Sequence, residues 1–98
     1  MRWQLRDFRI RSGALGQFAV EWRETVAPAR VAAGFSIVGP WLVPDESRFI
    51  WVLGYDGDFV AADEAYYEAR SIEPDPARLV EEVSALFMED PPARAATR

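Results

Sequence analysis

FSIVGPWLVPDESRFIWVLGY, residues 35–55, decides the fold of this 98-residue chain. Two runs rich in aromatic and β-branched residues, 35–43 and 48–55, flank the turn-forming segment Pro44-Asp45-Glu46-Ser47. A polar turn between two such runs predicts a β-hairpin.

Apolar side chains occupy both faces of the predicted strands. In the second run, one face carries Phe49, Trp51, Leu53 and Tyr55, and the other carries Ile50 and Val52. The N-terminal segment 3–10 alternates in the same way, with Phe8 and Ile10 opposite Trp3 and Leu5. Because a strand with one solvated face would not place bulky apolar groups on both sides, we expect both faces to be covered.

Helical spacing appears on both sides of the hairpin. A first helix is predicted after Ser12-Gly13, with apolar positions at Leu15, Phe18, Ala19, Trp22 and Val26. Pro28 is expected to kink or tighten it before Gly34 ends it in a left-handed cap. A second helix is predicted from the N-cap Asp58 to Arg70, with Phe59, Ala62 and Tyr66 toward the core and Asp63, Glu64 and Glu68 outward. A closing strand over 80–88 follows a helical turn from Pro76.

The order strand, helix, strand, strand, helix, strand predicts a ferredoxin-like α+β domain over 1–89, with both helices on one face of an antiparallel sheet. Residues 90–98 are predicted to be a disordered tail. The other face of the sheet is expected to carry Phe8, Trp41 and Trp51. We therefore predict a homodimer in which two sheets pack face to face, a dimeric α/β barrel.

Composition excludes several classes of function. The chain has eleven arginines, no lysine and a net charge of -5, and its arginines are dispersed, so we expect no nucleic-acid partner. Cysteine and histidine are absent, so any metal would need an all-oxygen site. The acids Asp56, Asp58, Asp63 and Glu64 match no calcium loop, and we predict no metal and no cofactor; haem would need a tyrosine ligand. The absence of a long apolar run and of a signal-like N-terminus predicts a cytoplasmic protein without a membrane partner.

The chain resembles the NIPSNAP family of the dimeric α/β-barrel superfamily over 3–88. The segments that carry the resemblance are Trp3-Gln4-Leu5-Arg6-Asp7-Phe8, Trp22-Arg23-Glu24 with Pro28, Gly34-Phe35, Val38-Gly39 with Trp41, Arg48-Phe49-Ile50-Trp51 with Tyr55, Asp58-Phe59 and Ala65-Tyr66-Tyr67. Gln4, Asp7 and Ala33 depart from the family's usual residues. The resemblance implies a dimer and a cavity between sheet and helices that binds a small molecule or a partner. Related branches include cofactor-independent monooxygenases and haem-degrading enzymes.

Arg6 is the first candidate for holding a ligand, because a buried guanidinium needs an anion or another acceptor. The alternative is a structural ion pair with an acid such as Glu81 or Glu82 from the neighbouring strand. The candidate cavity residues are Gln4, Arg6, Phe8, Trp41, Trp51, Tyr55 and Tyr66, of which Trp41, Trp51 and Tyr55 are expected on the same side as Arg6. These aromatic groups suit either a pocket wall or a packed core. The pattern leaves open whether Tyr66 or Tyr67 faces the cavity.

Two functions remain open at this point. One is a homodimer that binds a small aromatic or hydrophobic molecule and acts as a monooxygenase-like or isomerase-like enzyme of specialised metabolism. The other is a non-catalytic interaction or ligand-sensing module. An open cavity with an unpaired Arg6 would favour the first, whereas a filled interior with Arg6 paired to a glutamate would favour the second.

Overall fold

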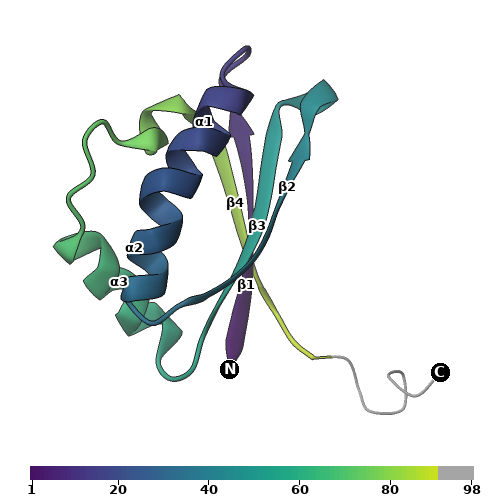
Figure 1. The fold of residues 1–98 in the computed structure, drawn as a ribbon. Coiled ribbons are helices and arrows are strands. Elements are labelled where there is room, and N and C mark those ends of the chain that lie inside the picture. The colour runs from purple at the N-terminus through teal and green to yellow at the C-terminus, as the bar shows by residue number, and fades with distance from the viewer. Residues whose placement is uncertain (91–98) are drawn as a thin grey trace.

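The computed structural model describes residues 1–90 as an antiparallel sheet with helices packed against one of its faces (Figure 1). The strands are β1 (Arg2–Ile10), β2 (Ser36–Val43), β3 (Arg48–Tyr55) and β4 (Val80–Met88), in the spatial order β2-β3-β1-β4. The helices are α1 (Leu15–Glu21), α2 (Ala27–Ala32) and α3 (Phe59–Ala69). This topology confirms the predicted ferredoxin-like α+β fold. Of the predicted tail, residues 91–98 lie outside the described residues.

A bulge in β2 changes the face on which the second half of that strand presents its side chains. Val38 pairs with Val52, but the next pair is Trp41 with Ile50, so β2 uses three residues where β3 uses two. Gly39, with φ of 101°, and Pro40, which has no N–H to donate, occupy the irregular segment. Trp41 therefore lies on the same face as Val38.

The first helical segment widens before Pro28. Residues Trp22–Val26 form a π-helical turn between α1 and α2, and the N–H of Ala27 donates to the carbonyl of Trp22, five residues earlier. We predicted that the helix would kink or tighten at Pro28. A distortion is present there, but the helix widens instead. Pro28 has no N–H, and the helix adjusts by widening in the turn before it. The predicted end at Gly34 is confirmed, with φ of 95°.

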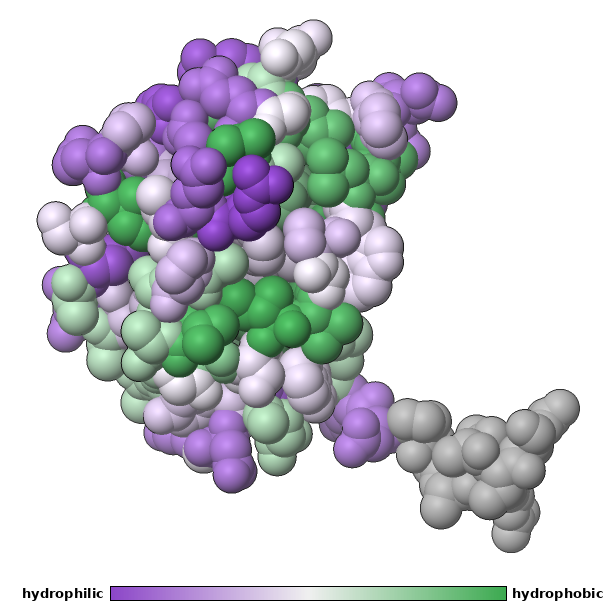
Figure 2. All heavy atoms as spheres, viewed as in Figure 1, coloured by the Kyte–Doolittle hydropathy of each residue, from purple (hydrophilic) through white to green (hydrophobic). Residues whose placement is uncertain are grey.

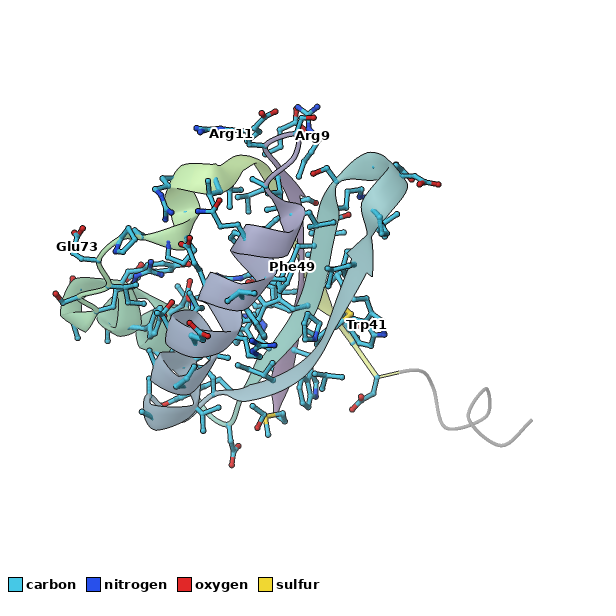
Figure 3. All side chains as sticks on the ribbon, turned by 45° about the horizontal axis from the view of Figure 1, so that its top comes forward. Arg9, Arg11, Trp41, Phe49 and Glu73 are labelled. Atoms are coloured by element: carbon cyan, nitrogen blue, oxygen red, sulfur yellow. The ribbon has the colours of Figure 1, made fainter. Side chains whose placement is uncertain are left out.

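The core lies between the sheet and the helices. Phe18 packs edge-on against Phe49 with ring centroids 4.9 Å apart, and Trp22 packs against Trp51 at 5.2 Å. Figure 3 shows Phe49 in this layer. Such pairs add to the stability that burial of their area supplies. Among the described residues, no helix combines the length and the apolar character needed to cross a membrane.

The opposite face of the sheet, which we call the open face, has no helix against it in the single chain (Figure 1). A row of apolar side chains crosses all of its strands, consisting of Val38, Val52, Leu5 and Leu86 in paired register. Trp41, 52% exposed, extends this surface on the side away from the helices (Figure 3). Hydrophobic residues reach the corresponding right-hand edge of Figure 2. Monomeric soluble proteins rarely expose a large continuous apolar surface.

The prediction that Phe8 and Trp51 belong to this open face is wrong. Phe8 contacts Phe18 of α1, and Trp51 contacts Trp22, so both side chains face the helices. Each of them lies opposite a buried residue of the adjacent strand. Phe8 of β1 pairs with Phe49 of β3, and Trp51 of β3 pairs with Arg6 of β1. The open face is instead formed by the alternate residues of each strand.

Candidate functional site

A cavity of about 570 Å³ lies between the sheet and the helices. Its walls are aromatic and come from Phe8, Phe18, Trp22 and Trp51. The segment after α3, residues 70–77, and the beginning of β4 complete the lining. This volume lies within the range of small-molecule sites, which are mostly apolar with a few polar groups.

Arg6 lies at the buried end of this cavity, where β1 directs it toward the helices. Its Nε donates to Oε1 of Gln4 at 2.7 Å, and its terminal nitrogens donate to the hydroxyl of Tyr67 at 2.9 Å and to the carboxylate of Asp63 at 3.1 Å. The guanidinium also lies 5.8 Å from the ring centroid of Trp51. Gln4 and Trp51 are therefore its immediate neighbours, as their register along β1 and β3 requires.

A second buried arginine shares the same carboxylate. Arg30, only 1% exposed, donates to Oδ1 of Asp63 at 2.7 Å and lies 3.7 Å from the ring centroid of Tyr66. The side chain of Asp63 is 24% exposed, so the prediction that it faces outward is wrong. Two guanidinium groups and one carboxylate thus form a cluster, which we call the Arg6–Asp63–Arg30 cluster.

Sequence reasoning missed Arg30 and Asp63 although the helical spacing contained the signal. Arg30 continues the series Phe18, Trp22 and Val26 in steps of four, which places it on the buried face. Asp63 follows Phe59 by four residues and precedes Tyr67 by four, so it lies on the inner face of α3. A charged residue is expected to face outward. Arg30 and Asp63 instead face inward, because the charge of each side chain compensates that of the other.

Several buried donors of this region have no hydrogen-bond partner within residues 1–90. They are Nε1 of Trp22, Nε1 of Trp51 and Nε of Arg30, and the hydroxyl of Tyr66 is likewise unpaired. Both tryptophans and Arg30 line the cavity. Because an unsatisfied buried polar group costs free energy, such groups are common where a ligand or water completes the bonding.

The predicted site residues fall into three places. Arg6, Phe8 and Trp51 line the cavity, and Gln4 orients Arg6 beside it. Tyr55 and Tyr66 line a different hollow of about 480 Å³, which lies between α2 and α3 and is formed largely by alanines. Trp41 is on the open face, so the expectation that it shares a side with Arg6 is wrong. The β2 bulge is the reason, because its extra residue reverses the alternation.

The choice between the two adjacent tyrosines is settled by their contacts. Tyr67 lines the cavity and accepts a hydrogen bond from Arg6, whereas Tyr66 is buried against Arg30 and Phe35. Burial raises the pKa of the Tyr66 hydroxyl above its ordinary value of 10.0. Tyr66 therefore stays neutral in the physiological range, and Tyr67 is the tyrosine available to a ligand.

Acidic residues line the outer part of the cavity, and two of them pair closely with arginines other than Arg6. Asp75 accepts a hydrogen bond from Arg70 at 2.5 Å, and Glu82 accepts one from Arg9 at 2.5 Å. The structural ion pair that we gave as the alternative role of Arg6 is present, but its acid is Asp63, whereas Glu81 and Glu82 contact Arg9. The register of β4 is the cause, since it places Ala85 opposite Arg6 and Glu82 opposite Arg9.

An ion pair joins α1 to the helical turn Pro76–Leu79 beside the cavity. Glu21 accepts hydrogen bonds from both terminal nitrogens of Arg78, at 2.7 and 2.8 Å. These bonds, with a smaller contribution from Gln17, lower the pKa of Glu21 below its ordinary value of 4.5. A carboxylate whose pKa is lower in the folded state than in the unfolded state stabilises the fold at a pH above its unfolded-state pKa. This stabilisation is lost as the pH falls through the folded-state pKa.

A Glu21→Gln variant is therefore expected to melt about 2 to 5 °C below the unmodified protein at pH 7. The difference should shrink as the pH falls below 4.5, because the native carboxyl becomes protonated. Thermal melts followed by circular dichroism at pH 7, 5, 4 and 3 measure it. Glu24→Gln is the control, since the nearest contact of Glu24 with Arg23 is 4.0 Å. A difference that is constant with pH would contradict the expectation.

Solved structures with the same fold are found among NIPSNAP proteins. An uncharacterized NIPSNAP domain protein from Burkholderia xenovorans is similar with a TM-score of 0.74 and 16% identity, over 93% of this chain and 95% of that one. A NIPSNAP family protein from Agrobacterium tumefaciens is similar with a TM-score of 0.71 and 19% identity, over 90% of each chain. An antibiotic biosynthesis monooxygenase is similar with a TM-score of 0.67 and 14% identity, over 94% of this chain and 100% of that one.

These comparisons confirm the structural resemblance that the sequence predicted, and at such identities they establish a shared fold. No protein-family model matches the sequence, and no curated protein matches it either.

Proposed function

We propose that this chain is a NIPSNAP-like homodimeric barrel protein that binds a small aromatic or hydrophobic molecule in the cavity between its sheet and its helices. The observation that carries this proposal is the cavity of about 570 Å³, in which aromatic walls surround the buried Arg6. A site of this kind takes up a flat apolar molecule by burial of its area and orients it through a few polar contacts.

The open face supports the homodimer. Its apolar row runs across every strand of the sheet, and the two-fold packing of one such face on another would bury the same residues in each copy. A second copy is the natural occupant because it would bring an identical apolar row to cover this one. The dimer would leave the cavity free, since the cavity lies on the helix side.

The proposal also extends to catalysis. The likeness to an antibiotic biosynthesis monooxygenase favours an enzyme of specialised metabolism that oxidises or isomerises its ligand without a bound cofactor. Such an enzyme would rely on orientation, proton transfer and stabilisation of charge. Arg6 and Tyr67 are the cavity groups that would hold charge and a proton.

A non-catalytic interaction or ligand-sensing module is the second candidate. The observation that favours it is the pairing of Arg6 with Asp63, which gives the guanidinium a structural role. The open cavity favours the small-molecule-binding protein, whereas the pairing of Arg6 favours the non-catalytic module. For both candidate functions we propose that the protein is cytoplasmic.

Native mass spectrometry of the protein, purified gently from its own host, tests the proposal. We expect an assembly of twice the 11.1 kDa chain mass that retains a small aromatic or hydrophobic molecule. Loss of that molecule from an Arg6→Met variant, with retention in Arg23→Met, which is exposed and outside the cavity lining, would assign it to the cavity. A monomer would contradict the proposed dimer, and a dimer of bare mass in every sample would favour the non-catalytic module.

A further inference from the structure

The Arg6–Asp63–Arg30 cluster carries more positive than negative charge. The side chains of Arg6 and Arg30 are 7% and 1% exposed, and within residues 1–90 the carboxylate that contacts both of them is that of Asp63. The cluster contains two guanidinium groups and one carboxylate, so one positive charge has no carboxylate partner in the cluster. Burying an unpaired charge is costly unless a counter-ion neutralises it.

Hydrogen-bond donors also exceed acceptors at this end of the cavity. A guanidinium offers five N–H groups, and the side-chain bonds of Arg6 use three of them. The indole nitrogens of Trp22 and Trp51, which come from opposite walls of the same cavity, are buried without a partner in the described part of the chain. What this region needs is therefore an acceptor, and a charged oxygen is the acceptor that guanidinium groups bind most strongly.

The acidic residues that also line the cavity do not supply this counter-charge. Glu81 and Glu82 have side chains 48% and 69% exposed, and the carboxylate of Glu82 contacts Arg9. Asp75 is 45% exposed and contacts Arg70, and Glu73 lies on the outer loop of the molecule (Figure 3). Because water and salt screen exposed charges, their effect on the buried guanidinium groups is small.

We infer that the ligand of this cavity is an organic anion, a flat aromatic or otherwise apolar body that carries a carboxylate or an enolate-type oxygen. The inference rests on the proposed binding function and specifies its ligand class. The anionic oxygen lies against Arg6 and neutralises the excess charge of the cluster, while the apolar body lies against the aromatic wall that Phe8, Trp22 and Trp51 form together. The same arrangement would stabilise negative charge developing on a bound ketone or phenol.

Calorimetric titration with two matched probes tests the inference. 2-Naphthoate and 2-naphthamide share one aromatic body and differ in charge. We expect the carboxylate to bind the full chain about tenfold more tightly than the amide, because charge-assisted bonds to a buried guanidinium are the stronger ones. In Arg6→Met the preference should fall to about twofold, since Arg30 still balances Asp63. Arg23→Met, at an exposed helical position outside the cavity lining, should keep the full preference.

The outcomes separate the ligand class from the binding function. Equal affinity for the two probes in the unmodified chain would overturn the inference and leave the proposed apolar pocket standing. Binding of neither probe would overturn both. Competition by sodium acetate at the same concentration as naphthoate would overturn the aromatic part of the inference and indicate a simple anion site. These comparisons use the unmodified chain, so they stand even if Arg6→Met does not fold.

Discussion

An Asp63→Asn variant is expected to lose about 3 kcal/mol of its free energy of unfolding, because it leaves two buried guanidinium groups without a carboxylate. The partial exposure of Asp63 places the expected loss at the lower end of the values known for broken buried ion pairs. Urea denaturation followed by tryptophan fluorescence measures it. Urea is preferred to guanidinium chloride because it does not screen charge. The protein concentration must be held constant, since dimer formation would contribute to stability.

The neighbouring acid provides the matched control. Glu64 is exposed on the same helix, and Glu64→Gln should change the free energy of unfolding by less than about 0.5 kcal/mol. Adding Arg30→Met to Asp63→Asn should recover part of the lost stability, because it removes one of the unpaired charges. Equal stability of Asp63→Asn and Glu64→Gln would mean that the cluster is not a stabilising unit.

Replacing Val52 by Glu is expected to weaken the proposed dimer by about a hundredfold or more, since two buried carboxylates would have to enter one interface without partners. Val52 is at the centre of the apolar row on the open face, between Val38 of β2 and Leu5 of β1. Its side chain does not contact the helix-side core. Sedimentation velocity over a range of protein concentrations measures the shift from dimer to monomer.

Val60→Glu is the control for this experiment. Val60 is exposed on α3, on the helix side of the sheet, so the same substitution there should leave association unchanged. The cavity faces the helices, and a folded Val52→Glu monomer is therefore expected to retain an aromatic probe. A dimer that persists unchanged in Val52→Glu would show that any association uses another surface.

The main features of the fold could be predicted because local pattern and tertiary structure agree. The strand Arg48–Tyr55, the N-cap at Asp58 and the turn from Pro76 before β4 all match their expected positions. In each case the signal is local, as with alternation in a strand or the Asp58 carboxylate, which accepts a hydrogen bond from the N–H of Ala61. Such features do not depend on knowing which elements are neighbours.

The site could be predicted only in part because it depends on register and on pairing between distant residues. Arg6 was identified from its place in one strand, but its partner Asp63 lies 57 residues away on α3. Trp41 was assigned to the wrong face because alternation was extended through Gly39-Pro40, where a bulge adds one residue. Arg30 was missed because its charge was given more weight than its position on the buried helical stripe.

The bulge of β2 also bears on how this protein avoids uncontrolled assembly. β2 is an edge strand of the sheet, and a regular edge would offer a template to which a further strand could add. Pro40 has no N–H to donate, and the irregular pairing at Gly39 interrupts the row of backbone groups on that edge. Growth of the sheet from molecule to molecule is thus obstructed at β2. The proposed association uses the open face instead, where a two-fold contact would close on itself and would not extend into a fibre.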